Sequence, residues 1–190
     1  VLFAGVSRAV SEDISRDIGA KTRTLPNPVN VQAMQSALIS RDAARSALGQ
    51  NDTDYLIGVV GRLHPKKNPL LAAKAFRCAS DELGPEAKLI FVGDGELADR
   101  LPETETVRVM GFIPNVKRYM RAFDLIVSTS TPQEAFGMSL IEALVARVPV
   151  ICTDQPGPRE VLGKAVRYVP DDDSRALAAA LIESKSEVVL

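Results

Sequence analysis

The sequence of 190 residues has no tryptophan, a single histidine, two cysteines and few aromatic side chains, which make up 5% of the chain. Cys78 and Cys152 lie far apart and form neither a CxxC motif nor a zinc-type spacing. Both lie in apolar stretches, so we expect buried free thiols in a reducing compartment. The formal net charge is only −1. This balance argues against a global basic field, and we expect no nucleic-acid partner.

Long apolar runs are missing as well. No run approaches the ~18 residues that span a bilayer, and no signal peptide is visible. We therefore expect a cytoplasmic protein and leave open a peripheral contact with the inner face of the membrane. The chain starts at Val1 without a methionine and stops inside a helix-like segment, which is typical of a piece of a longer protein.

The motifs of several common sites are also absent. The sequence has no P-loop, no G-x-G-x-x-G and no H-E-x-x-H. The acidic run Asp171–Asp173 resembles a metal site superficially, but it precedes a helical pattern and predicts a helix cap. We therefore expect no metal site.

What the chain does contain is an alternation of short apolar strands and helical patterns. Predicted helices start at Pro69 and lie near 96–101, 115–122, 137–146, 158–162 and 173–184, and predicted strands span 55–60, 88–92, 107–110, 124–128, 148–152 and 165–169. This alternation predicts an α/β fold with a Rossmann-like, doubly wound parallel sheet of about six strands, covered on both faces. Ligands of such sheets bind beyond the carboxyl ends of the strands.

The first thirty residues follow a different pattern. Residues 1–6 read as a strand, and Ser7 caps an amphipathic helix that runs through Ile18. Thr24–Asn30 then contains two prolines and predicts a linker. One interpretation is an N-terminal helix packed on a single domain.

The chain is organised around residues 133–142. They follow an apolar strand and a polar turn at Thr129–Gln133, and they open a helix. The first backbone N–H groups of that helix, from about Gly137 to Leu140, are expected to lack intrahelical partners, and the helix dipole adds positive potential. Gly137 has no side chain to keep a phosphate away. This arrangement predicts an anion site.

Two carboxylates, Glu134 and Glu142, frame the predicted site. Because a carboxylate repels an anion, each is expected to accept hydrogen bonds from hydroxyl groups instead. A nucleotide-sugar supplies a diphosphate, ribose hydroxyls and sugar hydroxyls together. The alternative interpretations are that Glu134 only favours the helix dipole and that Glu142 is a solvated helix residue.

The combination of these residues resembles the signature of retaining glycosyltransferases with the GT-B fold, the glycosyl transferases group 1 family. The signature is Glu134, seven residues, then Glu142, with Phe136-Gly137 between them. Three further matches follow other strands, at Gly61-Arg62-Leu63 with Lys67, at Gly93-Asp94-Gly95 and at Thr153-Asp154 with Glu160.

Four positions depart from the family pattern, because they carry other residues where glycine is usual. These are Pro28, Asn68, Arg147 and Pro156. The changes concern turn geometry and leave the charges of the motifs in place. Gly93-Asp94-Gly95 is also explained as a tight turn alone.

The resemblance implies transfer of a sugar from a nucleoside-diphosphate-sugar to an acceptor hydroxyl with retention of configuration. It implies that Arg62 and Lys67 contact the diphosphate, that Glu134 orients the sugar and Glu142 the ribose, and that no metal or other cofactor is needed. The backbone near Ile113 would contact the nucleobase, with Lys117 or Arg118 nearby. The implied catalytic residues are Arg62, Lys67 and Glu134, and the implied contacts to the sugar donor are Gly61, Ile113, Arg118, Phe136, Gly137, Met138, Ser139, Leu140 and Glu142.

The resemblance also implies a division into domains. Residues 1–25 would end a mostly absent acceptor-binding domain, and residues 26–190 would form the nucleotide-sugar domain. A glycan or lipid-linked acceptor would be bound mainly by the absent domain, so this chain alone is expected to be inactive. Two alternatives stay open, a non-catalytic sugar-nucleotide-binding module and a sugar-nucleotide epimerase of the same fold. The intact Arg62, Lys67, Glu134 and Glu142 favour the transferase over the binding module, and Phe136-Gly137 within the motif argues against the epimerase.

Overall fold

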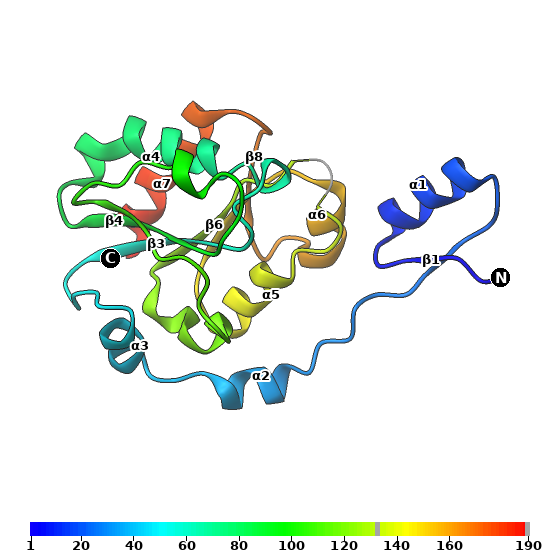
Figure 1. Cartoon of the computed structure of the whole chain (residues 1–190), viewed down its shortest axis with the longest axis horizontal. Helices are drawn as coiled ribbons and strands as arrows, with labels where there is room; N and C mark the ends of the chain where they lie inside the picture. The colour runs from blue at the N-terminus through cyan, green and yellow to red at the C-terminus, as the bar shows by residue number, and fades with distance from the viewer. Residues whose placement is uncertain (132–133, 189–190) are drawn as a thin grey trace.

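The computed structural model of the chain describes residues 1–131 and 134–188. Its centre is a parallel sheet of six strands in the order β5-β4-β3-β6-β7-β8 (Figure 1). The strands are β3 (Tyr55–Val60), β4 (Ala87–Val92), β5 (Val107–Val109), β6 (Leu125–Ser128), β7 (Val150–Thr153) and β8 (Arg167–Val169). The predicted α/β fold is therefore confirmed. The strand order reverses between β3 and β6, and ligands of such sheets bind at this switch point.

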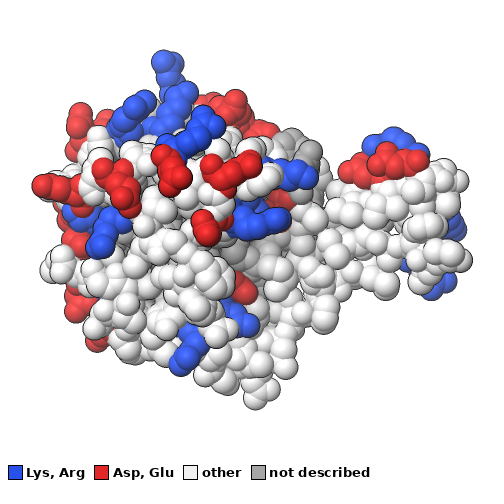
Figure 2. All heavy atoms as spheres, viewed as in Figure 1, with Lys and Arg blue, Asp and Glu red and all other residues white. Residues whose placement is uncertain are grey.

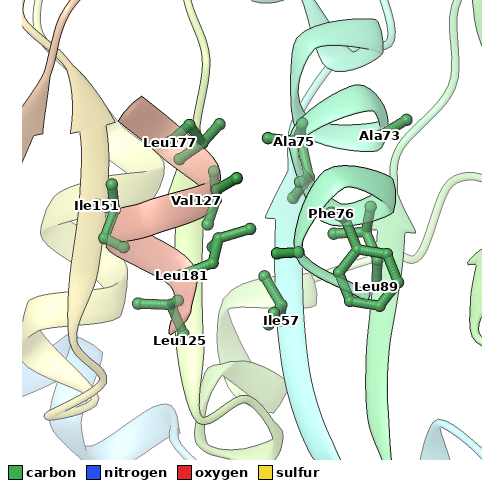
Figure 3. Close-up of a cluster of buried hydrophobic side chains, with 14 of the residues drawn as sticks. Ile57, Ala73, Ala75, Phe76, Leu89, Leu125, Val127, Ile151, Leu177 and Leu181 are labelled. Carbon is green, nitrogen blue, oxygen red and sulfur yellow. The ribbon is translucent and has the colours of Figure 1, made fainter. Parts of the chain in front are cut away.

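Helices cover both faces of the sheet. One face packs against α4 (Pro69–Leu83) and α7 (Ser174–Val188), and Figure 3 shows Leu177 and Leu181 of α7 beside Val127 of β6. The other face packs against α3 (Arg41–Ala47), α5 (Met138–Val145) and the 3-10 helix η3 (Val116–Ala122). Strands buried on both faces explain the continuous apolar runs of the sequence.

The predicted helix at Pro69 is confirmed, and its apolar spacing gives the buried face. Ala72, Phe76 and Ala79 are buried against the sheet. Cys78 is exposed, so the expectation of two buried thiols is wrong for this residue. Cys78 lies two positions after Phe76, and two positions along a helix turn a side chain away from the buried face. Cys152 is buried on β7, and burial raises the pKa of its thiol to about 12.

Two segments predicted as helices are 3-10 helices. These are η2 (Ala98–Arg100) and η3, and a third short one, η1 (Pro65–Lys67), follows β3. The segment of η2 is short, and it ends before Pro102, which disfavours helical geometry in the residue that precedes it. After β7, α6 (Pro156–Leu162) begins at Pro156, a residue well suited to the first position of a helix. The side chain of Asp173 accepts hydrogen bonds from the N–H groups of Arg175 and Ala176, as predicted for a helix cap.

The N-terminal segment forms a small unit apart from the sheet, beyond α6 (Figure 1). It comprises β1 (Ala4–Gly5), α1 (Arg8–Ile18) and β2 (Arg23–Thr24), and the two strands pair in parallel. Residues 25–30 run without regular structure to α2 (Val31–Ala37), as the linker prediction requires. The unit contacts the rest of the chain where the N–H of Arg8 donates to the carboxylate of Glu160 on α6, at 2.8 and 3.0 Å.

Charges of both signs are mixed on the face shown in Figure 2. No helix within residues 1–131 and 134–188 is long and apolar enough to cross a membrane. Residues 132 and 133, the end of the predicted polar turn, lie outside the described part of the chain.

Candidate functional site

The loops that follow β3 and β4 pack directly on each other. A Cβ atom on Gly93 would lie 1.8 Å from the carbonyl oxygen of Gly61, and one on Gly95 would lie 2.4 Å from that of Leu63. Gly93 also has φ of +149°. The two glycines are therefore required by the close approach of two backbones as well as by the turn.

A cavity of about 330 Å³ opens beyond the carboxyl ends of β3 and β4. Its lining is mostly apolar and consists of Val60, Gly61, Arg62, Val92, Gly93, Asp94, Phe112, Ile113 and Val116. Phe112, one of these residues, is 75% exposed. The cavity has the size and lining that suit a small planar ring. Ile113, predicted to lie near a nucleobase, is part of this lining, whereas Arg118 is not.

A second small pocket lies at the switch point itself, between the ends of β3 and β6. Arg62, Lys67 and Ser139 are among its lining residues, and Arg62 also lines the larger cavity. The predicted residues Gly61, Arg62 and Lys67 are thus brought together with the start of α5. Arg62 is exposed, so its guanidinium can reach an anion placed between the larger cavity and the small pocket.

Hydrogen bonds fix the loop after β6 to the loop after β3. The buried hydroxyl of Thr129 donates to the carbonyl oxygens of Lys67 (3.0 Å) and Asn68 (2.8 Å), and the N–H of Thr131 donates to that of Lys66 (2.9 Å). Asn68 adopts φ of 42° and ψ of 52°, a left-handed conformation that asparagine tolerates better than most residues. The replacement of the usual glycine therefore preserves the turn that starts α4.

Glu134 lies at the centre of these contacts. Its carboxylate forms an ion pair with the ammonium of Lys67 and accepts hydrogen bonds from the hydroxyl of Ser130 (2.9 Å) and the N–H of Gly137 (3.1 Å). Burial raises the pKa of Glu134, but the hydrogen bond and charge of Lys67, together with Ser130 and Gly137, outweigh it, so the pKa is lowered overall. Glu134 is therefore held ionised.

The start of α5 offers fewer free N–H groups than predicted. The N–H of Gly137 donates to Glu134, and that of Leu140 donates to the carbonyl oxygen of Gly137. Met138 and Ser139 keep backbone N–H groups without a hydrogen-bond acceptor among the described residues. The predicted run of four free groups is thus reduced to two. Gly137 has φ of +82°, which a residue with a Cβ rarely adopts, and this accounts for glycine here.

The other predicted residues in α5 or just before it divide into two groups. Phe136 and Leu140 have buried side chains, 6% and 1% exposed, so only their backbones could face a ligand. Glu142 is half-buried, and burial raises the pKa of its carboxyl while the charge of Lys117 opposes this shift. Neither the solvated-residue interpretation of Glu142 nor the pure dipole interpretation of Glu134 describes these surroundings.

Sequence reasoning missed several residues of the site. Ser130, which is 2% exposed, holds Glu134, and its own carbonyl oxygen accepts from the hydroxyl of Thr153 at 2.6 Å. Asp94 and Phe112 line the larger cavity. No periodicity marks a loop residue such as Ser130, and Gly93-Asp94-Gly95 matches the family pattern and a tight turn without indicating a ligand contact for Asp94.

The chain is similar in sequence to several proteins named as glycosyltransferases. It is 30% identical over 187 residues to the putative teichuronic acid biosynthesis glycosyltransferase TuaC of Bacillus subtilis. The matched region covers 97% of this chain and 46% of TuaC. It is 27% identical over 146 residues to UDP-Gal:alpha-D-GlcNAc-diphosphoundecaprenol alpha-1,3-galactosyltransferase of Escherichia coli, covering 72% of this chain and 38% of that enzyme. The chain therefore spans less than half the length of these relatives.

Solved structures show the same fold. Anabaena HepE in complex with UDP-glucose has a TM-score of 0.82 at 24% identity, covering 99% of this chain and 54% of HepE. WaaG, a glycosyltransferase involved in lipopolysaccharide biosynthesis, has a TM-score of 0.84 at 20% identity, covering 98% of this chain and 54% of WaaG. The sheet and its helices are thus those of GT-B glycosyltransferases. Residues 40–187 match the family described as glycosyl transferases group 1, and the chain belongs to this family.

Proposed function

We propose that this chain is the part of a retaining glycosyltransferase that binds the sugar donor, a nucleoside-diphosphate-sugar. The observation that carries the proposal is the convergence of Arg62, Lys67, Glu134 and the free N–H groups of α5 at the switch point of the sheet. The adjoining cavity of about 330 Å³ provides room for a nucleobase. The relatives support the same class of ligand, because HepE was solved with UDP-glucose and the E. coli enzyme is named for UDP-galactose.

The proposed chemistry is stabilisation of the leaving group. When the bond between the anomeric carbon and the β-phosphate oxygen breaks, its electron pair stays on the phosphate. Arg62, Lys67 and the N–H groups of Met138 and Ser139 would neutralise the charge that develops there. Because these groups supply two positive charges and two N–H donors, the proposed step uses no metal ion and no cofactor.

The remaining parts of the function are proposals of the same kind. Residues 1–25 would end an acceptor-binding domain, residues 26–190 would form the donor domain, and a glycan or lipid-linked hydroxyl compound would be the acceptor. Glu134 would orient the transferred sugar and Glu142 the ribose. A cytoplasmic site of action, with a peripheral contact at the membrane, fits an acceptor linked to a lipid.

Calorimetry tests the proposal directly. The chain is titrated with UDP, GDP and ADP and with the corresponding glucose nucleotides. One nucleotide series should bind saturably, and Arg62→Ala should weaken it about ten- to a hundredfold, since hydrogen bonds between charged groups contribute roughly 1.5–3 kcal/mol. Binding of none of these ligands, or unchanged affinity in Arg62→Ala, would contradict the proposal. The anomeric configuration of the product, measured by NMR with a longer active protein, tests retention separately.

A further inference from the structure

A second cavity lies at the opposite end of the sheet from the proposed donor site. It has a volume of about 350 Å³ and lies where β6 and β7 begin. Three arginines, Arg41, Arg121 and Arg147, line it together with Asp124 and apolar side chains. The arginines come from the start of α3, from η3 and from the loop after α5, where Arg147 is the second residue beyond Val145. Guanidinium groups from three separate elements therefore converge on one hollow.

The single carboxylate in this lining is already occupied. One oxygen of Asp124 pairs with Arg41, and the other accepts from the buried Arg45 (2.7 Å) and from the N–H of Leu56 (2.7 Å). Arg121 and Arg147 form no ion pair within residues 1–131 and 134–188. Because the one negative charge of Asp124 is shared between Arg41 and Arg45, at least two of the three positive charges in the lining are uncompensated.

The backbone of Arg147 supplies an independent observation. Arg147 has φ of 63°, the left-handed conformation in which a residue with a Cβ is strained and glycine is not. The resemblance described above also expects glycine at this position. A cation at the end of α5 interacts favourably with the helix dipole, which accounts for a basic residue here. It does not account for Arg41 and Arg121, which belong to other elements.

We propose that this cavity is an anion-binding site, distinct from the donor site, for a phosphate or diphosphate group. Guanidinium groups bind phosphate oxygens in a bidentate manner, and two uncompensated charges match a dianion. The N–H groups of Arg147 and Val148 donate to carbonyl oxygens of α5, so recognition rests on the side chains. The eight residues of α5 separate this site from the donor site by about 12 Å of helix, so both can be occupied together.

Titration with inorganic pyrophosphate tests the site. Arg62→Ala serves as the background, because it removes the competing contact at the donor site. Adding Arg147→Gly or Arg121→Gln should weaken pyrophosphate binding about tenfold or more. Arg147→Gly also relieves the left-handed backbone, so the variant should keep a melting temperature at or above that of its background.

Two controls match these changes. Asp172→Gly replaces another exposed residue with positive φ (53°), and Arg175→Gln removes an arginine from α7. Both should leave pyrophosphate affinity unchanged, which separates the cavity from general effects of backbone and net charge.

The source of the phosphate is tested with vesicles. If the ligand is a lipid headgroup, phosphatidylcholine vesicles containing phosphatidylglycerol should bind the unmodified chain, and Arg147→Gly and Arg121→Gln should abolish this binding. Pyrophosphate binding without vesicle binding supports a free phosphorylated ligand. If both variants keep the affinity of their background for pyrophosphate and for vesicles, the site does not exist and Arg147 only caps α5. Nucleotide binding lost in Arg62→Ala would still support the donor site in that case.

Discussion

At the scale of single residues, Lys67 and Glu134 neutralise each other at the point where the proposed reaction needs them apart. Lys67 would contact the diphosphate and Glu134 the sugar, yet the two side chains form an ion pair, 33% and 11% exposed. A bound diphosphate would draw Lys67 away and free an oxygen of Glu134 for a sugar hydroxyl. The ion pair therefore competes with the nucleotide for Lys67.

This competition predicts opposite effects of one substitution on two ligands. Glu134→Gln removes the charge that holds Lys67, so the free nucleoside diphosphate should bind at least as tightly as before. The sugar nucleotide should bind about tenfold more weakly, because the sugar loses a charged acceptor. Glu142→Gln should instead weaken both ligands alike, since both contain ribose. Calorimetry with the two ligands measures all four changes, and an identical pattern in both variants would show that the proposed roles are wrong.

The ionisation of Glu142 should also make the stability of the fold depend on pH. Burial raises the pKa of its carboxyl, with Lys117 opposing, so ionisation destabilises the fold. This cost is absent below the unfolded pKa of about 4.3 and develops as the pH rises through the raised folded pKa. Glu142→Gln, neutral at every pH, should therefore match the unmodified chain near pH 4 and be more stable near pH 7. Urea unfolding at both values measures the difference, and equal stability at pH 7 would contradict it.

At the scale of elements, the loop after β6 depends on Thr129 for its place beside η1. Thr129→Val keeps the shape but leaves the carbonyl oxygens of Lys67 and Asn68 without this donor, which should cost about 1–3 kcal/mol of unfolding free energy. Ser80→Ala, which removes one exposed hydrogen bond to Arg77, should cost less than about 0.5 kcal/mol. Nucleotide affinity should fall only in Thr129→Val. Equal stability of the two variants would show that the loop is held by other contacts.

The elements themselves could be predicted because apolar periodicity specifies them. The strand Tyr55–Val60 and the buried face of α4 follow from local sequence, and the parallel alternation fixes the sheet type. The 3-10 character of η3 could not be predicted, because its span has the same apolar spacing as an α-helix. The strand β7, which ends at Thr153, also starts later than predicted, at Val150, because Pro149 lacks an N–H for the ladder.

Site residues are predictable from the sequence where charge and glycine mark a strand end, and not where a contact depends on the path of an irregular loop or on the packing of separate elements. Arg62 and Lys67 stand out in the sequence, whereas Ser130 acquires its partner only when the loop folds back on Glu134. The loss of two free N–H groups at α5 also comes from local contacts, because the N–H of Gly137 donates to Glu134 and that of Leu140 donates to the carbonyl oxygen of Gly137. Arg147 was recognised as a departure, but its convergence with Arg121 required the packing of η3 against α5.

At the scale of the whole molecule, the described residues include those of the proposed donor site, and too few residues precede the linker to form the proposed acceptor-binding domain. The residues proposed to bind the diphosphate all lie within the described chain, around Arg62, Lys67 and the start of α5. Before the linker stands only the unit of β1, α1 and β2, too short for a second Rossmann-like domain of on the order of 100 residues. The relatives are about twice as long as this chain, which covers 46% of TuaC and 54% of HepE.

We therefore expect this chain to bind the sugar nucleotide but not to transfer the sugar. Transfer in a two-domain cleft needs an acceptor pocket and the exclusion of water from the reacting bond, and neither follows from the donor site alone. The experiment pairs this chain with a longer protein that joins it to an N-terminal domain, and titrates both with the same nucleotide-sugar. Affinity should persist in reduced form in this chain, while an acceptor assay should detect product only with the longer protein. Transfer by this chain alone would refute the two-domain proposal, whereas absence of nucleotide binding would refute the donor site, so the two failures are distinguishable.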